Sequence, residues 1–406
     1  MIELRQHAEY TYKFNAKSGR HGWLRLTPAY SRRIVESLIL GRPQGTRVFD
    51  PFCGTGTTAL CASSHGYECV TIDINPFLVW LATVKTASYS PEDIAATAEA
   101  CKQALALVAQ SAVEPCPAPP IWNITRWWNE DARIFLQFLR AAIDAVAPKE
   151  SPVRSLLLVA FCRTLMMVSN AAFDHQSMSF KDSGRLRPEL EAHYGSMFEA
   201  NVSFVLEGAK ENPAGSVSVV LGDSRHLGNV ARGSFDIVIT SPPYANRMSY
   251  VRELRPYMYW LNYLDNGHDA GELDWLAIGG TWGIATSRLM DWERPSEHFQ
   301  STLLDGVLDT IAHTDNRNGA LLARYVAKYF DDVWAHLSGL PPLLARGAEV
   351  HYIVGNSTFY GTMVPTEKLY AEMFRVLGFT AIECKPIRKR NSKKELIEFD
   401  VSARWT

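Results

Sequence analysis

The sequence predicts an α/β fold built on a doubly wound, Rossmann-like sheet that carries a helical insertion. Three observations predict it. An apolar strand at 47–50 runs into a loop with two glycines and then into a helix. A second apolar strand, 235–240, ends at two prolines, which fix the backbone and cannot donate to a sheet. Strands and helices alternate on both sides of a purely helical stretch, and such alternation indicates a parallel sheet with right-handed crossovers.

The composition is that of an ordinary globular protein. The chain has 406 residues, of which 47% are hydrophobic and 21% charged, enough for one large core or two domains. No apolar run approaches the ~18 residues that cross a membrane, and the first five residues do not form a signal peptide. We therefore expect a cytoplasmic protein without a membrane partner. The seven cysteines form no Cys-x-x-Cys pair, so neither a disulfide framework nor a metal site is expected.

In the first half of the chain, the sequence predicts an amphipathic helix, then two strands that alternate with two helices, and a glycine loop that could bind a ligand. An amphipathic helix through 32–39 is expected to start at Thr27, a cap before Pro28. Strand 47–50, helix 57–64, strand 68–73 and helix 76–85 follow. Gly54 and Gly56 let a ligand approach the backbone, and the helix after them presents free N–H groups. Asp73 ends the second strand about 20 residues later, where an acid accepts hydrogen bonds from a ribose.

The second half completes the sheet. Strand 216–223 and strand 235–240 are followed by helix 321–337, strand 349–357, helix 366–377 and two closing strands, 380–384 and 396–403, around a basic loop. Residues 264–318 are expected to form a long, partly irregular lid. Thr-Ser-Pro-Pro-Tyr at 240–244 lies at the carboxyl end of its strand, where open α/β sheets bind their ligands.

The pair Asp-Pro-Phe-Cys-Gly-Thr-Gly-Thr-Thr at 50–58 and Thr-Ser-Pro-Pro-Tyr at 240–244 resembles the amino-group DNA methyltransferases. These enzymes use S-adenosyl-L-methionine on a class I methyltransferase sheet. The resemblance covers about two thirds of the chain. It implies a nucleoid-associated enzyme that methylates double-stranded DNA, with a cognate restriction endonuclease as a candidate partner.

The resemblance also implies the roles of individual residues. The catalytic turn is Ser241, Pro242, Pro243 and Tyr244, and a serine in its first position favours cytosine N4 over adenine N6. Asp223, at the end of its strand, is expected to reach the cofactor's adenine amino group, and Thr27 its methionine end. The full set of expected cofactor residues is Thr27, Asp50, Phe52, Cys53, Gly54, Gly56, Thr57, Thr58, Asp73, Ile74, Asn75, Asp223, Ser224 and Ser241.

The chemistry that the turn predicts is direct transfer to an exocyclic amine. The Ser241 hydroxyl and the Pro242 carbonyl would accept hydrogen bonds from the amine and aim its lone pair at the methyl group. Because this amine is unreachable in a duplex, the target base is expected to flip out and stack on Tyr244. No Pro-Cys pair occupies the catalytic position, which argues against methylation of cytosine carbon 5, and the transfer needs no metal.

Three regions are expected to contact DNA. The segment after Tyr244 supplies Arg247, Tyr250 and Arg252, and the basic run at 385–394 supplies Arg388 and Arg390. For that run, a solvated loop is an equally good interpretation, and the net charge of −2 shows no basic footprint over the whole chain. The third region is the polar loop at 174–187 with Lys181, within the helical stretch 91–206. A nearby cluster of Trp122, Trp127 and Trp128 fits core filling better than base stacking.

These regions divide the chain into three predicted parts. Residues 1–88 form the amino-terminal segment and the first half of the methyltransferase domain. Residues 89–210 form a helical insertion that is expected to recognise the target, and residues 211–406 form the second half, with an inserted loop region at 264–320. Three alternatives stay open on sequence alone: an adenine-N6 enzyme, an RNA amino-methyltransferase, and a nucleic-acid-binding protein without catalysis. Target sequence and oligomeric state are not predicted.

Overall fold

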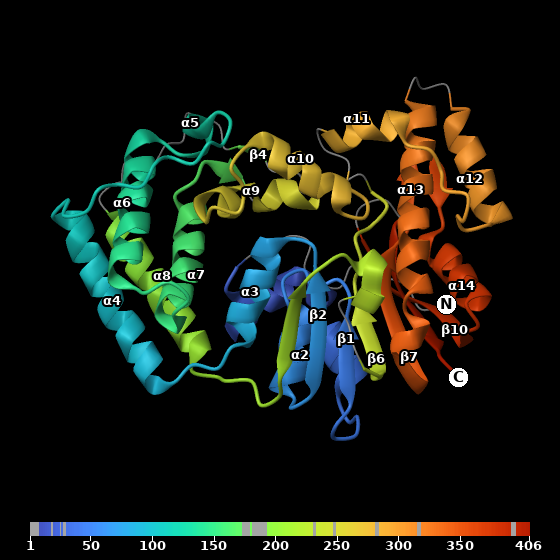
Figure 1. Cartoon of the computed structure of the whole chain (residues 1–406), viewed down its shortest axis with the longest axis horizontal. Coiled ribbons are helices and arrows are strands. Elements are labelled where there is room, and N and C mark those ends of the chain that lie inside the picture. The colour runs from blue at the N-terminus through green and yellow to red at the C-terminus, as the bar shows by residue number, and fades with distance from the viewer. Residues whose placement is uncertain are drawn as a thin grey trace.

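A seven-stranded sheet organises the chain (Figure 1). The computed structural model describes residues 8–17, 19–24, 26, 30–172, 179–180, 193–229, 233–246, 249–280, 284–314, 318–390 and 395–406. The strands of the sheet are β1 (Arg47–Asp50), β2 (Glu68–Asp73), β5 (Val217–Leu221), β6 (Phe235–Thr240), β7 (Leu344–Gly355), β10 (Thr380–Lys389) and β11 (Ile397–Arg404).

The strand order is β10-β11-β7-β6-β1-β2-β5. The five strands from β5 to β7 are parallel, whereas β11 is antiparallel to both of its neighbours. The chain moves outward from β1 through β2 to β5 and then returns to the other side of β1 with β6 and β7. This order confirms the predicted doubly wound, Rossmann-like sheet, which ends in an antiparallel hairpin.

Helices cover both faces of the sheet because its buried strands alternate apolar side chains between the two faces. Val48 and Ile237 pack with α1 (Arg32–Ile39) and α2 (Thr57–Ser64) in one cluster. Phe49 and Val238 point into another cluster, with α13 (Gly319–Ser338) and α14 (Thr366–Val376). The sheet is therefore buried between two helical layers, and its strand ends are left to carry a site.

The segment between β2 and β5 is helical, as predicted, and packs in one core with α3 (Pro76–Thr86), with Trp23 and Leu24, and with residues between 251 and 270. Its elements are α4 (Pro91–Ala109), α5 (Ile124–Trp127), α6 (Glu130–Val146), α7 (Pro152–Met167), the short strands β3 (Ala171–Ala172) and β4 (Ser179–Phe180), and α8 (Tyr194–Ala209). These helices form one end of the molecule, and α12–α14 form the other (Figure 1).

The segment predicted as an irregular lid is largely helical where the structure describes it. After β6 come α9 (Tyr250–Trp260), α10 (Gly267–Leu276), α11 (Ile284–Asp291) and α12 (Thr302–Ala312). Caps at Asn266 and Ser301, which accept hydrogen bonds from N–H groups of the first turn, start α10 and α12. In Figure 1, α9 and α10 (yellow) cross above the strand ends. These helices are short and separated by loops, so the hydrophobic pattern of the sequence did not reveal them.

Other boundaries also differ from the prediction. The cap of α1 is Ser31, whose hydroxyl accepts from the N–H of Arg33, and Thr27 lies outside the described residues. Strand β7 begins at Leu344, before the predicted 349. Strand β10 continues to Lys389, so the first half of the basic run belongs to a strand, and residues 391–394 lie outside the described residues. The remaining elements are β8 (Ser357–Phe359), β9 (Thr362–Val364) and the 3-10 turns Ala8–Tyr10, Tyr12–Lys17, Gly19–Gly22, Ser224–Asn229 and Pro341–Leu343. Among the described helices, none is both long and apolar enough to cross a membrane.

Candidate active site at the carboxyl edge of the sheet

The glycine loop and the Ser-Pro-Pro-Tyr turn lie at the ends of neighbouring strands, β1 and β6. The Thr240 hydroxyl donates a 2.6 Å hydrogen bond to Oδ1 of Asp50, which also accepts the N–H of Phe52 at 3.0 Å. Because the chain leaves β1 in one direction and β6 in the other, this pair marks the topological switch point of the sheet. Ligands of open α/β sheets bind in the crevice at such a point.

Asp50 itself is completely buried, and its Oδ2 has no hydrogen-bond partner. Burial raises the pKa of Asp50 to about 6, although bonds from Thr240 and Phe52 act in the opposite direction. The carboxyl group therefore joins the two motifs at an electrostatic cost. The Asp50 side chain is bonded to the start of the glycine loop and to β6, and it has no exposed surface that a ligand could contact.

Asp50 makes a testable contribution to the pH dependence of stability. Between its unfolded pKa of 3.8 and its folded pKa of about 6, the folded protein holds a proton that the unfolded chain has released. The free energy of unfolding should therefore fall as pH rises through this window. Denaturant titrations at pH 4 and pH 7 should give Asp50→Asn a relative gain of roughly 2–3 kcal/mol at the higher pH. The same titrations on Asp236→Asn, a change at an exposed carboxyl on β6, provide the control; an equal gain there would contradict the assignment.

The glycine loop is held from β2. The Gly54 N–H donates to Oδ2 of Asp73 at 2.7 Å, and the Asn75 N–H donates to Oδ1 at 2.9 Å. Gly56 has a positive φ of 76°, and a Cβ there would lie 3.1 Å from the Cβ of Ala82. Burial raises the pKa of Asp73 to about 7. Its carboxyl group keeps lone pairs for further donors, because each oxygen has accepted one bond.

Burial divides the predicted cofactor residues into two groups. The partly exposed ones, which a ligand can touch, are Phe52, Gly54, Asp73, Ile74, Asp223 and Ser241. The buried ones are Asp50, Cys53, Gly56, Thr57, Thr58, Asn75 and Ser224. Several of the buried side chains bond inside the protein: Thr58 donates to the carbonyl of Ile239 at 3.1 Å, and Asn75 caps α3. These side chains shape the loop, and the partly exposed group forms its surface.

Asp223 lies on the surface of this edge but is already paired. Arg225 Nη2 donates to its Oδ2 at 2.6 Å and Nε to its Oδ1 at 3.0 Å, while Nη1 of the same arginine donates to Asp332. Burial acts to raise the pKa of Asp223, but the bonds from Arg225 outweigh it and the pKa is lowered. Asp223 is therefore a fixed, ionised carboxylate, and any ligand bond would share it with Arg225.

The Ser-Pro-Pro-Tyr turn is bonded to three different elements. The Ser241 hydroxyl donates to the carbonyl of Ile353 on β7 at 3.1 Å. The Tyr329 hydroxyl of α13 donates to the carbonyl of Pro243 at 2.8 Å, and the Tyr244 N–H donates to Oη of Tyr250 on α9 at 2.8 Å. These contacts fix the backbone of the turn, and the Ser241 hydroxyl also interacts with the side chain of Tyr244.

The residues expected to contact DNA have varied positions. Arg388 is ion-paired with Glu398, and Arg390 lies over the ring of Tyr244. Arg390 therefore lies beside the Ser-Pro-Pro-Tyr turn, and Arg388 is paired within the final hairpin. Arg252 is half-buried in the first turn of α9. The oxygen of Tyr250 is occupied by Tyr244, while Lys181 and Arg247 lie outside the described residues.

Sequence reasoning missed Tyr329 and Glu398. Both lie far from either motif in the chain, and nothing near them forms a recognisable pattern. One signal was available for Glu398: it follows the basic run by only a few residues on the next strand. Tyr329 offered none, because an aromatic residue on a helical apolar face is usually core.

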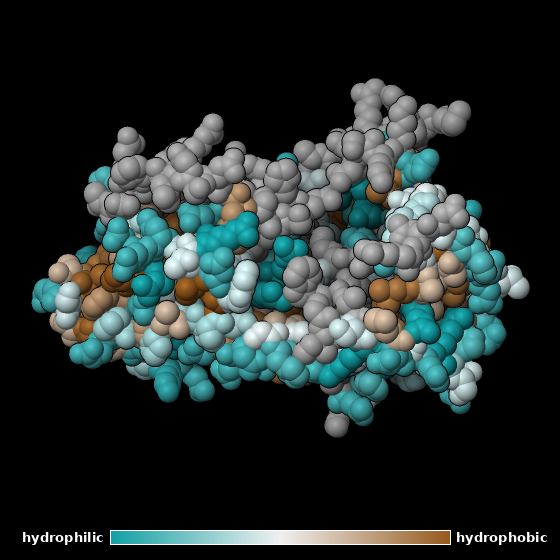
Figure 2. All heavy atoms as spheres, turned by 90° about the horizontal axis from the view of Figure 1, so that it is seen from above, coloured by the Kyte–Doolittle hydropathy of each residue, from teal (hydrophilic) through white to brown (hydrophobic). Residues whose placement is uncertain are grey.

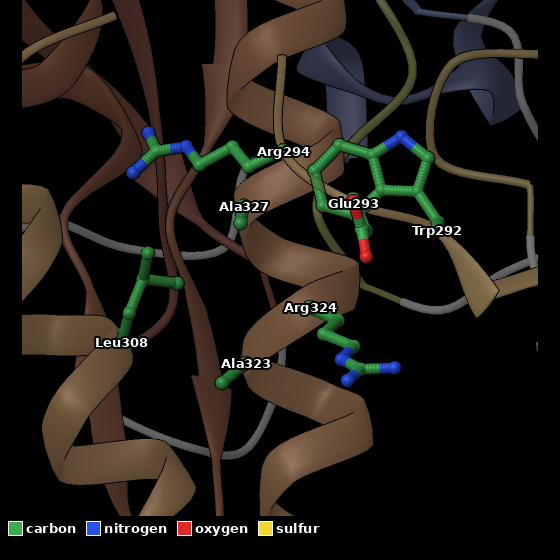
Figure 3. A pocket seen from close by; sticks show the side chains of 7 residues that line it. All are labelled: Trp292, Glu293, Arg294, Leu308, Ala323, Arg324 and Ala327. Atoms are coloured by element: carbon green, nitrogen blue, oxygen red, sulfur yellow. The ribbon is translucent and has the colours of Figure 1, made fainter. Parts of the chain in front are cut away.

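A separate hollow of about 350 Å³ lies beside α13 (Figure 3). Ala323 and Ala327 of α13 lie on one side of it and Leu308 of α12 on the other. Arg294 at its margin is ion-paired with Asp331. None of its lining residues belongs to either motif, so the chemistry is assigned to the sheet edge.

Three comparisons place the chain among known proteins. Residues 32–115 match the family model of the D12 class N6 adenine-specific DNA methyltransferases. Type II methyltransferase M.MvaI of Kocuria varians is 23% identical over 380 residues, which are 86% of this chain and 79% of that protein. Type II methyltransferase M.BsoBI of Geobacillus stearothermophilus is 22% identical over 433 residues, covering 95% of this chain and 84% of its own. These matches confirm the predicted resemblance to the amino-group methyltransferases.

Among solved structures, the rRNA methyltransferase aviRa from Streptomyces viridochromogenes aligns with 92% of this chain and 83% of its own. The identity is 11% and the TM-score 0.27.

Proposed function

We propose that this chain, a relative of the amino-group methyltransferases, transfers a methyl group from S-adenosyl-L-methionine to the exocyclic amine of a flipped base in double-stranded DNA. The observation that carries the proposal is the direct hydrogen bond between Asp50 and Thr240. It joins a glycine loop suited to the cofactor with a rigid polar turn suited to an amine, at the switch point of the sheet.

The residues at this edge fit the cofactor. A Cβ on Gly54 would meet nothing closer than the carbonyl of Phe52 at 3.9 Å, so the backbone is open on that side. Gly56, at the start of α2, provides no side-chain cap, which leaves N–H groups of the first turn to a ligand. Asp73 would accept hydrogen bonds from the ribose, and Phe52 and Ile74 would offer apolar contacts. The cofactor supplies an electrophilic methyl group on a positively charged sulfur.

The geometry of Ser241 suits the activation of an amine. Its hydroxyl hydrogen is directed to the Ile353 carbonyl, so toward the crevice the oxygen acts as an acceptor. A hydrogen bond from the target amine to this oxygen would favour a pyramidal nitrogen whose lone pair leaves conjugation with the ring. The neighbouring Pro242 carbonyl is the second candidate acceptor. The turn needs no covalent bond to the base.

Tyr244 is the candidate stacking surface for the flipped base. Tyr244 as a whole residue is partly exposed, and its backbone N–H is bonded to Tyr250. Unpairing and unstacking the base costs a few kcal/mol, which stacking on an aromatic ring and phosphate contacts would offset.

The proposal for the target base depends on Ser241, which lies outside the residues that match the family model. Ser241 favours cytosine N4. The family model favours adenine N6, but it matches residues 32–115, which include the glycine loop and exclude the turn that would hold the base. We therefore propose cytosine N4, with adenine N6 as the second candidate.

The helical insertion is our candidate for target recognition. Trp128 is buried in its core, as expected, whereas Trp122 is 84% exposed. Seen from above, hydrophobic residues are visible at both ends of the molecule, including the end formed by the insertion, and the described residues between the two ends are largely hydrophilic (Figure 2). Both similar proteins carry the name type II methyltransferase, so we propose a cognate restriction endonuclease as a partner.

Expression in a host without DNA methylation, followed by sequencing that reports modified bases, tests the function. We expect a single short motif carrying N4-methylcytosine, absent from cells that express Ser241→Ala. N6-methyladenine in a single motif would correct the base and keep the mechanism. Unmodified DNA from cells with soluble, folded protein would contradict the proposed function.

A further inference from the structure

The hydroxyl of Tyr244 is hydrogen-bonded to a buried carboxylate. It donates a 2.8 Å hydrogen bond to Oε1 of Glu398 on β11, and Glu398 is only 3% exposed. Burial, followed by the charge of Glu398, raises the pKa of Tyr244 well above its ordinary range. The phenol therefore remains a neutral donor, and its direction is fixed by an acceptor from a strand 154 residues away in the chain.

Glu398 is held in turn by an arginine. Arg388 Nε donates to Oε2 at 2.8 Å, and its Nη2 donates to Oε1 at 3.0 Å. This two-point contact sets both the position and the plane of the carboxylate. Arg388 and Glu398 are partners in the β10–β11 ladder. The final hairpin of the fold therefore supplies both the acceptor for Tyr244 and the arginine that orients this acceptor.

A second arginine covers the ring. The guanidinium carbon of Arg390 lies 4.6 Å from the ring centroid of Tyr244, and its Nη1 donates to the carbonyl of Asn356 at 2.8 Å. Gly355 makes the approach possible, because a Cβ there would lie 2.4 Å from that nitrogen. One part of the Tyr244 ring is thus covered by a cation, and only the remainder is available for a base.

The buried Arg388–Glu398 ion pair is not expected to stabilise the fold appreciably. A buried ion pair contributes little compared with apolar side chains of similar volume, because both charges lose their water. A carboxylate in this place does one thing that an apolar residue cannot do: it accepts the hydrogen bond of Tyr244.

We propose that Glu398, oriented by Arg388, is a positioning residue that fixes the ring of Tyr244 for stacking against the target base. The proposal rests on the proposed function, because it assigns to Tyr244 the role of stacking surface. Under this proposal, Arg388 and Arg390 organise the surroundings of Tyr244, whereas the sequence had suggested that they bind phosphate.

A mutant cycle tests it. The paired change Arg388→Met/Glu398→Leu removes the acceptor without leaving an unpaired buried charge. It should lower kcat about tenfold to a hundredfold, as expected for the loss of a hydrogen bond to a charged group. The KM for DNA should change less than about threefold. In a Tyr244→Phe background, which lacks the hydroxyl, the same pair should cause no further loss. Equal losses in both backgrounds would mean a general structural effect and would overturn the proposal.

A matched control comes from the amino ends of β1 and β2. Arg47 and Glu68 are partners of these two strands and form an ion pair at 2.8 Å. Arg47→Met/Glu68→Leu should leave kcat within about twofold of the wild type. A loss as large as that of the first pair would overturn the specific role of Glu398.

Carbon-13 NMR of protein labelled at the phenol carbon of tyrosine gives a readout independent of activity. The Tyr244 signal is the one missing from Tyr244→Phe. It should move in Arg388→Met/Glu398→Leu and stay in place in the control pair. An unmoved signal, or full activity despite a moved one, would overturn the inference while leaving an active wild-type enzyme. A wild-type protein that methylates no DNA would overturn the proposed function and, with it, this role.

Discussion

Replacing Ser241 by alanine is expected to lower kcat roughly a hundredfold, the usual effect of deleting one hydrogen-bonding group that acts in a transition state. The affinity for S-adenosyl-L-methionine should stay within about twofold, because the side chain bonds to Ile353 of β7 and not to the glycine loop. Single-turnover methylation of a DNA that contains the identified motif measures the first quantity. Calorimetric titration measures the second.

The variant Ser203→Ala provides the matched control for Ser241→Ala. Its hydroxyl bonds to the carbonyl of Glu199 within α8, in the insertion and away from the turn. It should leave both quantities unchanged. Full activity of Ser241→Ala would remove the serine from the mechanism and would also remove the reason to favour cytosine N4.

Replacing Asp73 is expected to have the largest effect on cofactor binding. Asp73→Ala should weaken the affinity about tenfold to a hundredfold at pH 8, because it removes the ribose acceptor and two bonds to backbone N–H groups. Calorimetric titration with the cofactor measures the loss. An unchanged affinity would contradict the assignment of this edge as the cofactor site.

The affinity should also depend on pH through the same carboxyl group. Burial raises the pKa of Asp73 to about 7, and donors on a ribose favour the ionised form. The wild-type affinity should therefore rise as pH increases through 7 and level off above it. In Asp73→Asn, which keeps the shape of the side chain, this part of the pH dependence should be absent.

Much of the fold could be predicted because its signals are local. The bounds of β1, α2 and β2 match the predicted ranges 47–50, 57–64 and 68–73. Short apolar runs that end at glycine, proline or a capping residue specify such elements within a few residues of chain. The helical nature of the stretch 91–206 could be predicted for the same reason, and it contains the long helices α4, α6, α7 and α8.

The pattern failed where elements are short or depend on distant partners. Helices α10, α11 and α12 lie in the segment expected to be a partly irregular lid. Each is short, and α10 and α12 begin at the caps Asn266 and Ser301. Strand β10 extends into the basic run as far as Lys389, because pairing with β11 satisfies its backbone groups; the charge pattern of the run does not reveal that pairing.

The sequence by itself determined the sheet, the two motifs and the chemistry that they predict. Tertiary structure alone decided how the residues divide between surface and support. It buried Asp50 against Thr240, bonded Arg225, the partner of Asp223, to Asp332, and placed Glu398 within hydrogen-bond distance of the Tyr244 hydroxyl. The physical reason is that motifs record local backbone geometry, whereas these three contacts join residues 190, 107 and 154 positions apart in the chain.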